Sequence, residues 1–263
     1  MEFCRVDRDG YLLVVTLDRP QVRNALHRPA IDELDQVWAM YETDPELRVA
    51  ILTGAGERAF SAGYDMKEPS GRPGERSGGG FLATRHPRGF GALTHRFSMT
   101  KPIIAAVNGF AVGGGLELAL ACDIIVAADH AEFGFPEPRV GRMAMDGGMH
   151  RLVRHIPLKA AMGMLLTGRR ISAQEALRIG LVNEVVPAVE VLQAARRWAE
   201  QILECAPLSV QATKEAVLAG LGLPLAQAMA LVPPVMARSM ASEDHAEGVN
   251  AFLERRPPRW SGR

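Results

Sequence analysis

Several short stretches of this chain are apolar throughout, without the alternation of a strand that has one face in water. Three of them, residues 49–53, 102–107 and 124–128, have the length of a strand, and residues 11–17 form a fourth β-rich run. Strands that are apolar on both faces are typical of sheets covered on both sides by helices. The sequence therefore predicts an α/β protein built on a layered sheet.

Helical signals lie between the first two strands and along most of the chain after about residue 147. Pro29 lies near the start of a stretch whose apolar residues recur at helical spacing, at positions 31, 34, 37, 38 and 41. Ser172 and Glu175 have the spacing of a capping box, and Gly180 lies where a glycine would end that helix. Further helices are predicted over residues 116–121, 189–205, 208–218 and 242–253.

Composition narrows the class of protein. The 263 residues, with 30 Lys and Arg against 30 Asp and Glu, fit one large domain and provide no broad charged surface for nucleic acid or anionic lipid. Cys4, Cys122 and Cys205 are too few and too widely spaced for a disulfide scaffold or a zinc finger. No apolar run approaches the roughly 18 residues of a membrane span, and the N-terminus lacks the apolar core of a signal peptide. We therefore expect a cytoplasmic protein that binds neither nucleic acid nor membrane.

Residues 68–91 differ from the rest of the chain because they are rich in Gly, Pro, Arg and Ser, with consecutive glycines at positions 78–80. Because this stretch has little to bury, it is predicted to be a mobile surface loop. It follows a candidate site segment in the sequence. It is therefore either a lid that orders when a ligand binds or a solvated insertion without a role.

Two glycine-containing segments each follow an apolar strand and end near an acidic residue. Residues 59–65 read AFSAGYD, and residues 108–117 read NGFAVGGGLE before opening into a helix. Glycines at the start of a helix leave backbone N–H groups accessible, and the helix dipole favours negative charge there. Two N–H groups from different strands that converge on one carbonyl oxygen would form an oxyanion hole. Close packing of the helix on the sheet would explain the glycines equally well.

Candidate chemical groups follow these segments. Ser61 lacks the glycine that precedes the nucleophile of a GxSxG elbow, and no His or Asp partner is evident, so a serine hydrolase is disfavoured. Glu117 and Glu137 both stand in apolar sequence, where their pKa values could be pushed apart so that one acts as base and the other as acid. The alternative is that Glu117 only stabilises a helix start and Glu137 is an exposed loop charge.

Taken together, these segments resemble the enoyl-CoA hydratase/isomerase, or crotonase, superfamily. The resemblance implies an α/β fold, a spiral of repeated β-β-α units with a C-terminal helical region for trimerisation. It places the acyl-CoA site in residues 1–200 and the oligomerisation region in residues 201–263. It also implies a homotrimer or homohexamer without metal or redox cofactor, since coenzyme A is part of the substrate. The matching residues are 19–20, 24–26, 60–65, 101–117, 122–124, 133–141 and 166–186.

Residue roles are implied by the same resemblance. The oxyanion-hole N–H groups fall on Tyr64 and Gly114, and the acid/base pair of a hydratase falls on Glu117 and Glu137. We assign Glu117 as the base and Glu137 as the proton donor to Cα, although a coupled pair need not divide the roles cleanly. The implied contacts to the acyl-CoA thioester are Ala62, Tyr64, Asp65, Met66, Lys67 and Gly114, with Arg23 as a basic candidate for a phosphate.

The presence of both glutamates favours a hydratase or dehydratase, a lyase that adds water across the 2,3-double bond of an enoyl-CoA. An enoyl-CoA isomerase or an acyl-CoA thioester hydrolase remains an alternative, as does a non-catalytic RNA-binding or scaffold protein, which the balanced charge disfavours. Residues 142–146 read RMAMD where typical hydratases have a Gly/Pro-rich turn, which predicts a reshaped acyl pocket. Residues 89–94, 166–170 and 242–263 resemble the carnitinyl-CoA dehydratase subfamily, so a carnitinyl-CoA or crotonobetainyl-CoA type of substrate is a candidate.

One further segment bears on assembly. Residues 221–237 are apolar nearly all round, so something must bury them. The sequence leaves open whether another copy of the chain or the chain's own domain does so.

Overall fold

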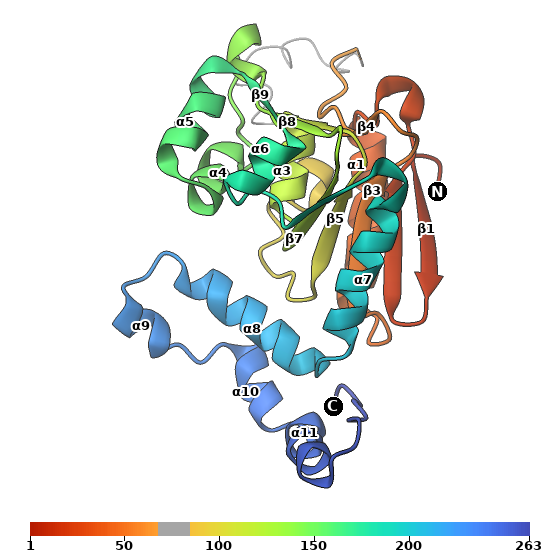
Figure 1. The fold of residues 1–263 in the computed structure, drawn as a ribbon, viewed down its shortest axis with the longest axis vertical. Coiled ribbons are helices and arrows are strands. Elements are labelled where there is room, and N and C mark those ends of the chain that lie inside the picture. Colours follow the sequence, from red (N-terminus) through yellow and green to blue (C-terminus); the bar gives the residue numbers. More distant parts are fainter. Residues whose placement is uncertain (68–84) are drawn as a thin grey trace.

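The computed structural model describes residues 1–67 and 85–263 (Figure 1). One sheet has six strands in the order β1-β2-β3-β5-β7-β10, and a second has four in the order β4-β6-β8-β9. The strands are β1 Cys4–Asp9, β2 Leu12–Leu17, β3 Val49–Gly54, β4 Ala59–Ser61, β5 Ile103–Val107, β6 Phe110–Val112, β7 Ile124–Ala128, β8 Glu132–Gly134, β9 Arg170–Ser172 and β10 Glu184–Val186.

The longer α-helices, each of eight residues or more, are α1, α4, α5, α7, α8 and α11. The elements labelled η are single 3₁₀ turns. Their bounds are α1 Arg28–Thr43, α3 Gly114–Leu120, α4 Gly148–His155, α5 Leu158–Thr167, α6 Ala173–Arg178, α7 Val191–Leu203, α8 Pro207–Gly220, α9 Leu225–Met229, α10 Pro234–Met240, α11 Glu243–Glu254, η1 Pro20–Val22, η2 Phe90–Ala92, η3 Glu137–Val140 and η4 Ala188–Glu190.

The apolar runs of the sequence form the centre of the six-stranded sheet. Strands β2, β3, β5, β7 and β10 run parallel, and only β1 pairs antiparallel, with β2. β2, β3 and β5 are buried along their whole length. Helix α7 packs across β3, β5 and β7 and covers one face of the sheet (Figure 1). The predicted α/β class with a covered parallel sheet is confirmed.

Local helix signals were also predictive. Helix α1 has a proline in its first turn and buries Ile31, Leu34, Val37, Trp38 and Tyr41, the predicted apolar face. The Ser172 hydroxyl accepts the Glu175 N–H at 3.2 Å, as a capping box requires, and Gly180 has a φ of +79° after the helix. Both devices act within a few residues, which explains why the sequence alone predicts them.

Short or exposed strands were not predicted. Strand β1 buries only Cys4, so its sequence carries no apolar pattern. The glycine-containing segment 108–117 holds the three-residue strand β6, which the sequence did not predict. A strand of this length is too short for periodicity to reveal.

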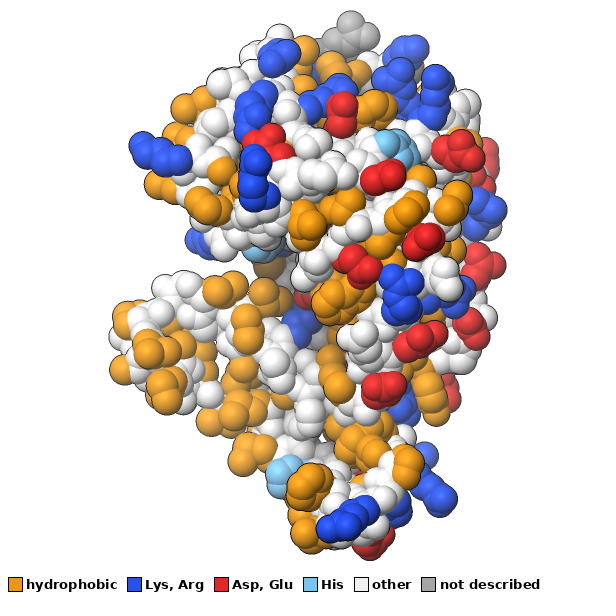
Figure 2. Space-filling view, in the orientation of Figure 1, with side chains coloured by type: hydrophobic (Ala, Val, Ile, Leu, Met, Phe, Trp, Pro, Cys, Tyr) orange, Lys and Arg blue, Asp and Glu red, His pale blue; other side chains and the backbone are white. Residues whose placement is uncertain are grey.

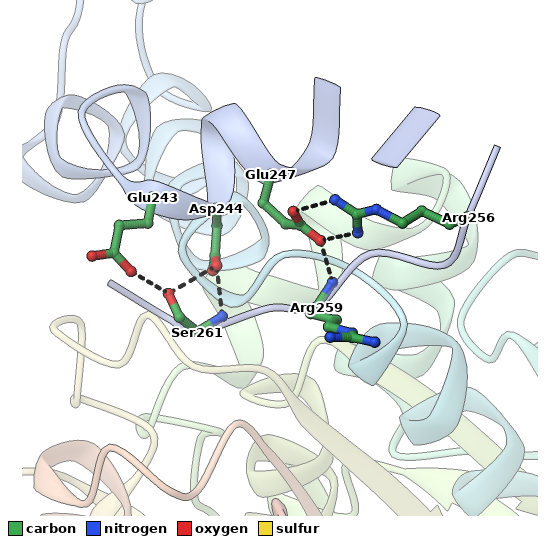
Figure 3. Close-up of a pocket in the computed structure, with 6 residues that line it drawn as sticks. All are labelled: Glu243, Asp244, Glu247, Arg256, Arg259 and Ser261. Atoms are coloured by element: carbon green, nitrogen blue, oxygen red, sulfur yellow. Dashed lines mark hydrogen bonds and ion pairs between the residues drawn. The ribbon is translucent and has the colours of Figure 1, made fainter. Parts of the chain in front are cut away.

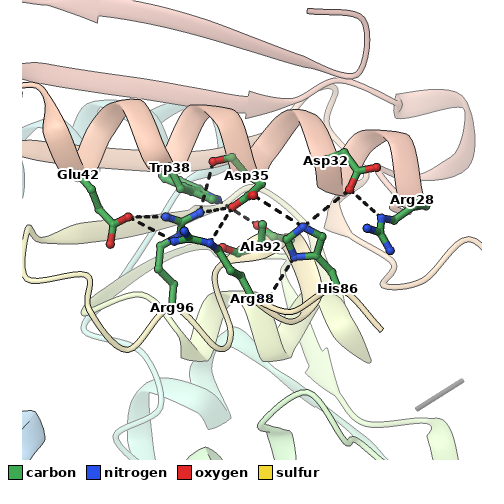
Figure 4. A network of polar contacts seen from close by, with 10 residues as sticks. Arg28, Asp32, Asp35, Trp38, Glu42, His86, Arg88, Ala92 and Arg96 are labelled. Atoms are coloured by element: carbon green, nitrogen blue, oxygen red, sulfur yellow. Dashed lines mark hydrogen bonds and ion pairs between the residues drawn. The ribbon is translucent and has the colours of Figure 1, made fainter. Parts of the chain in front are cut away.

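Part of the predicted surface loop is anchored in the core. Residues 68–84 lie outside the described residues, and so does most of the proposed lid. For residues 85–91 the loop prediction is wrong, because Phe90 and Gly91 are buried and the Trp38 indole N–H donates to the Gly91 carbonyl at 3.0 Å. Beyond them, Arg96 pairs with Asp35 and Glu42 of α1 (Figure 4).

Helices α8 to α11 extend away from the two sheets (Figure 1). The apolar residues 221–237 remain largely exposed on them, with Leu221 61%, Leu225 75% and Met229 78% exposed. Figure 2 shows hydrophobic side chains gathered over α8 and α9. Burial by the chain's own domain, one of the two alternatives, therefore does not occur within the described part of the chain. In that same part, no helix combines the length and apolarity needed to cross a bilayer.

Candidate active site

Three neighbouring parallel strands bring the candidate site residues together. β6 pairs with β4 on one side and with β8 on the other, in parallel register through Ser61 with Ala111 and Val112 with Gly134. The carboxyl ends of the three strands therefore point the same way, which is where α/β proteins usually bind ligands. Residues 62–65 follow β4, residues 113–117 follow β6, and Glu137 follows β8.

The two glycine segments touch at these strand ends. A Cβ atom on Gly63 would lie 2.9 Å from the Gly114 nitrogen, and one on Gly115 would collide with the Ser61 carbonyl. Gly63 also has a φ of +86°, which favours glycine. Gly114 is the first residue of α3, so its N–H has no acceptor within the helix. The backbone of Tyr64 thus lies close to an amide that is suited to bind an anionic oxygen.

Backbone contacts fix the segment after β4. The Ser61 hydroxyl donates to the Asn24 carbonyl at 2.8 Å and accepts the Gly63 N–H at 3.2 Å. The Ala62 N–H donates to the Arg23 carbonyl at 3.0 Å, and the buried Asn24 side-chain amide donates to Ala59. Ser61 is therefore engaged in shaping the turn, which agrees with the sequence argument against a serine hydrolase.

The predicted acyl-CoA contacts lie at the rim of this turn. Met66 and Lys67 are exposed, and so is Arg23, whose carbonyl contacts Ala62. Asp65 differs, because its carboxylate forms a largely buried ion pair with Arg19 at 3.0 Å. The role of Asp65 in the structure is therefore to hold the turn in place.

Glu117 is buried, with 3% of its surface exposed. Its Oε1 accepts the N–H of Gly148, the first residue of α4, at 2.9 Å. Burial raises its pKa to about 8, and the nearby carboxylates of Asp146 and Glu137 add to the rise. A carboxyl group that only stabilised the start of its own helix would lie in solvent and would keep a low pKa.

Glu137 is half-buried beside the glycine triplet. A Cβ on Gly113 would lie 2.8 Å from its Oε1, while its Oε2 is buried and has no hydrogen-bond partner among the described residues. Burial raises the pKa of this carboxyl too. Two buried carboxyls that repel each other retain a proton at pH values where exposed carboxyls are ionised.

Asp146 was missed as a site residue. It was noted only as part of a departure from the family pattern, yet it is 1% exposed and accepts the Tyr64 hydroxyl at 3.1 Å. The Arg85 Nε lies 2.8 Å from its other oxygen. Phe90 was missed as well; its ring centroid lies 4.6 Å from that of Tyr64. The only sequence signal that could have indicated Asp146 is that an aspartate follows apolar residues directly before Gly147.

Chemically, the site combines amide donors for a negative oxygen with two carboxyls that can exchange protons. Among residues 1–67 and 85–263, no group of three or more His, Cys, Asp or Glu side chains could hold a metal ion.

Known proteins resemble this chain along its whole length. The family described as enoyl-CoA hydratase/isomerase matches residues 7–263. The (E)-benzylidenesuccinyl-CoA hydratase of Thauera aromatica is 46% identical over 96% of both chains. The carnitinyl-CoA dehydratase of Escherichia coli K12 is 42% identical over 100% of this chain and 99% of its own.

Solved structures agree with these sequence relatives. The enoyl-CoA hydratase of Bacillus anthracis superposes with a TM-score of 0.91 at 35% identity, covering 100% of both chains. The enoyl-CoA hydratase of Mycobacterium tuberculosis H37Rv gives 0.89 at 37% identity, with the same coverage. The fold expected from the resemblance is confirmed by these neighbours.

Proposed function

The chain belongs to the enoyl-CoA hydratase/isomerase family, and we propose that it hydrates the 2,3-double bond of an enoyl-CoA thioester with Glu117 and Glu137 as its acid/base pair. Full-length relatives that are themselves a hydratase and a dehydratase support a lyase over the isomerase, thioester hydrolase and non-catalytic alternatives. The observation that carries the proposal is the buried Glu117 and the half-buried Glu137 beside two converging backbone segments. The carnitinyl-CoA dehydratase resemblance expected from the sequence is confirmed at 42% identity.

In the proposed reaction, the thioester carbonyl oxygen accepts hydrogen bonds from the N–H groups of Tyr64 and Gly114. Glu117 takes a proton from water, and the water oxygen bonds to Cβ as the double-bond electrons move to form an enolate on the carbonyl oxygen. Glu137 then donates a proton to Cα, and the enolate returns to the thioester. One water molecule is added, and the cycle closes when Glu117 releases its proton to solvent and Glu137 takes one up from solvent. General acid/base groups contribute about 10²–10⁴-fold and one oxyanion donor about 10²–10³-fold.

Coenzyme A enters this proposal only as part of the substrate. We propose that the exposed Lys67 and Arg23 contact its phosphates and that Ala62 and Met66 contact it at the same turn. Asp65 contributes by holding the turn through Arg19. We propose that the acyl group resembles those of the relatives' substrates, a benzylidenesuccinyl or a carnitinyl-type group.

The test is a panel of enoyl-CoA thioesters that includes crotonyl-CoA, crotonobetainyl-CoA and (E)-benzylidenesuccinyl-CoA. Hydration removes the conjugated double bond, so the absorbance of the enoyl thioester should fall without release of a free thiol. Release of the coenzyme A thiol without loss of the double bond would instead establish a hydrolase. Migration of the double bond would establish an isomerase.

We also propose that residues 201–263 assemble the protein into a homotrimer or homohexamer. The exposed apolar side chains of residues 221–237 support this assembly, since a monomer in solution rarely leaves such a surface uncovered. Light scattering at micromolar concentration should give three or six times the protomer mass. A monomer mass would contradict the proposal.

A further inference from the structure

Asp146 lies beside the proposed acid/base pair without belonging to it. We propose that Asp146 is a positioning residue for the hydration reaction, acting through its negative charge beside Glu117 and its hydrogen bond to the Tyr64 hydroxyl. This inference rests on the proposed function for its catalytic consequence, but the contacts that carry it are independent of any substrate.

The contacts of Asp146 connect two parts of the site. Its Oδ2 accepts the Tyr64 hydroxyl at 3.1 Å, so it holds the side chain of the residue whose backbone N–H is a proposed oxyanion donor. The Tyr64 ring is in turn packed on Phe90, and a Cβ on Gly114 would lie 3.0 Å from the Phe90 ring. The two oxyanion residues and Asp146 are therefore joined through one packed cluster, defined here as Tyr64, Phe90, Gly114 and Asp146.

The charge of Asp146 also acts on Glu117. Both carboxyls are almost fully buried, and a like charge in a poorly solvated site disfavours ionisation of its neighbour. Burial raises the pKa of Glu117 to about 8, and the charge of Asp146 adds to this rise. Removing this negative charge while keeping the side-chain shape should allow Glu117 to ionise at lower pH.

Other charged and titratable groups also surround this pair. Glu137 on η3 adds a second negative charge near Glu117, while Arg151 on α4 provides a positive one. Arg85 and His95 also lie beside Asp146, with Arg85 at 2.8 Å and His95 at 3.8 Å from its Oδ1. Asp146→Asn leaves the identity of each of these groups unchanged. The remaining titratable groups of this neighbourhood are Tyr64, which donates to Asp146, and Cys122 and His155, which lie near Arg151.

The first measurement is the titration of Glu117 in the substrate-free protein, by infrared spectroscopy of protein labelled with ¹³C-glutamate. The protonated carboxyl band that disappears in Glu117→Gln identifies the residue. Asp146→Asn should move the midpoint of this band down by about one pH unit. Because no substrate is present, this result stands even if the proposed hydration activity fails.

The second measurement is the pH dependence of kcat for the best substrate of the panel. If Glu117 is the base, the wild-type rate rises with pH through about 8, and Asp146→Asn shifts this limb down by the same unit. At about pH 6 its rate, relative to its own plateau, should then be roughly tenfold higher than in the wild type, since one pH unit is a tenfold change in ionisation.

Two controls separate charge from structure. Tyr64→Phe removes the hydroxyl but keeps the Asp146 charge, so its pH limb should stay where the wild type has it, while its kcat falls. Asp244→Asn makes the same substitution at another buried aspartate, on α11, and should leave the limb unmoved. The proposal is wrong if the Glu117 band of the wild type already titrates near pH 4.5, or if Asp146→Asn leaves the midpoint unchanged.

Discussion

In the candidate active site, the carboxyl groups of Glu117 and Glu137 have few hydrogen-bond donors around them. The C-terminal tail, residues 243–263, differs, because hydrogen-bond donors surround the carboxylates of Asp244 and Glu247 (Figure 3). Asp244 accepts the N–H groups of Ser261 and Gly262 at 2.7 and 2.9 Å. The Glu247 carboxylate accepts hydrogen bonds from the two terminal nitrogens of the Arg256 guanidinium, at 2.6 and 2.9 Å. The Arg259 N–H donates to Glu247 as well, at 2.7 Å.

The pKa values follow this contrast. Hydrogen bonds from Arg256 and from the Arg259 N–H lower the pKa of Glu247 to about 2, whereas burial raises that of Glu117 to about 8. A carboxylate with several donors stays ionised and ties the chain together. A buried carboxyl group without hydrogen-bond donors lowers the stability of the folded protein. Carboxyl groups with raised pKa values are common at sites of proton transfer. The same residue type therefore serves structure near the C-terminus and, in the proposed reaction, chemistry in the candidate site.

The largest expected effect tests the chemical half of this contrast. Glu117→Gln and Glu137→Gln keep the side-chain shape but cannot transfer the proton, so each should lower kcat by about 10²-fold or more. The dissociation constant of the substrate should hardly change, because coenzyme A is proposed to bind elsewhere, along the rim. Steady-state kinetics and calorimetry of substrate binding measure the two quantities separately.

The matched control is Glu247→Gln, which removes a carboxylate from the tail and should leave kcat within about twofold, since surface ion pairs contribute little. If both active-site variants hydrated the substrate at the wild-type rate, the two glutamates would be structural. If only Glu137→Gln lost activity, an isomerase would become the better description.

A second prediction concerns the amide of Gly114. Gly114→Pro removes its N–H, and proline is tolerated at the first position of a helix such as α3. Loss of one oxyanion donor should lower kcat by about 10²–10³-fold. Gly114→Ala is the matched control, because it brings a similar Cβ toward the Phe90 ring, 3.0 Å away, while keeping the N–H. Equal losses in the two variants would assign the effect to packing and exclude the oxyanion role.

The third prediction concerns the stability that Glu117 costs. Its pKa rises from 4.5 to about 8 on folding, so the folded protein keeps a proton that the unfolded chain releases between these pH values. The contribution of Glu117 to the free energy of unfolding should therefore fall as the pH rises from about 4.5 to 8, by a few kcal/mol at about 1.4 kcal/mol per pKa unit. Glu117→Gln lacks this proton and should lose this part of the fall.

Urea unfolding at several pH values and one fixed protein concentration measures this difference. The stability of Glu117→Gln relative to the wild type should increase steadily toward pH 8. Parallel pH profiles for the two proteins would mean that Glu117 titrates normally in the folded state. Glu247→Gln should run parallel to the wild type over this window, because the low pKa of Glu247 lies outside it.

The sequence predicted the elements whose signals are local. The apolar runs of β3, β5 and β7, the face of α1 and the capping box of α6 each depend on neighbouring residues. Strand β1 escaped prediction because only Cys4 is buried and pairing with β2 is what makes it a strand. The core of the chain was therefore more predictable than its edges.

The sequence predicted those candidate site residues whose glycine or glutamate patterns coincide with the family resemblance. It did not predict contacts between residues that are far apart in the sequence. Asp146 and Tyr64 are 82 residues apart, and nothing in either local sequence indicates that they meet. The ion pairs of Arg96 with α1 are of the same kind (Figure 4). Charge pairs between residues so far apart in the sequence depend on the complete fold. The sequence around each partner looks like that of an ordinary exposed charged residue.

The smallest expected effect concerns the tail. The pKa of Glu247 is lowered on folding, so its hydrogen bonds to Arg256 and Arg259 stabilise the tail above about pH 4.5 and are lost as the pH falls toward 2. Because these groups lie in a partly exposed segment near the C-terminus, the change should be local. Trp260 reports it, since its indole N–H donates to the Glu204 carbonyl at 2.7 Å.

Fluorine NMR of protein labelled with 5-fluorotryptophan separates Trp260 from the chain's other two tryptophans, one of which is the fully buried Trp38. On acidification the Trp260 signal should shift and sharpen before the Trp38 signal changes, because a released tail moves while the core is still folded. Glu247→Gln should give the shifted Trp260 signal already at neutral pH. Simultaneous changes at Trp260 and Trp38 would show that acid unfolds the whole protein at once, and that the tail carboxylates contribute no separate step.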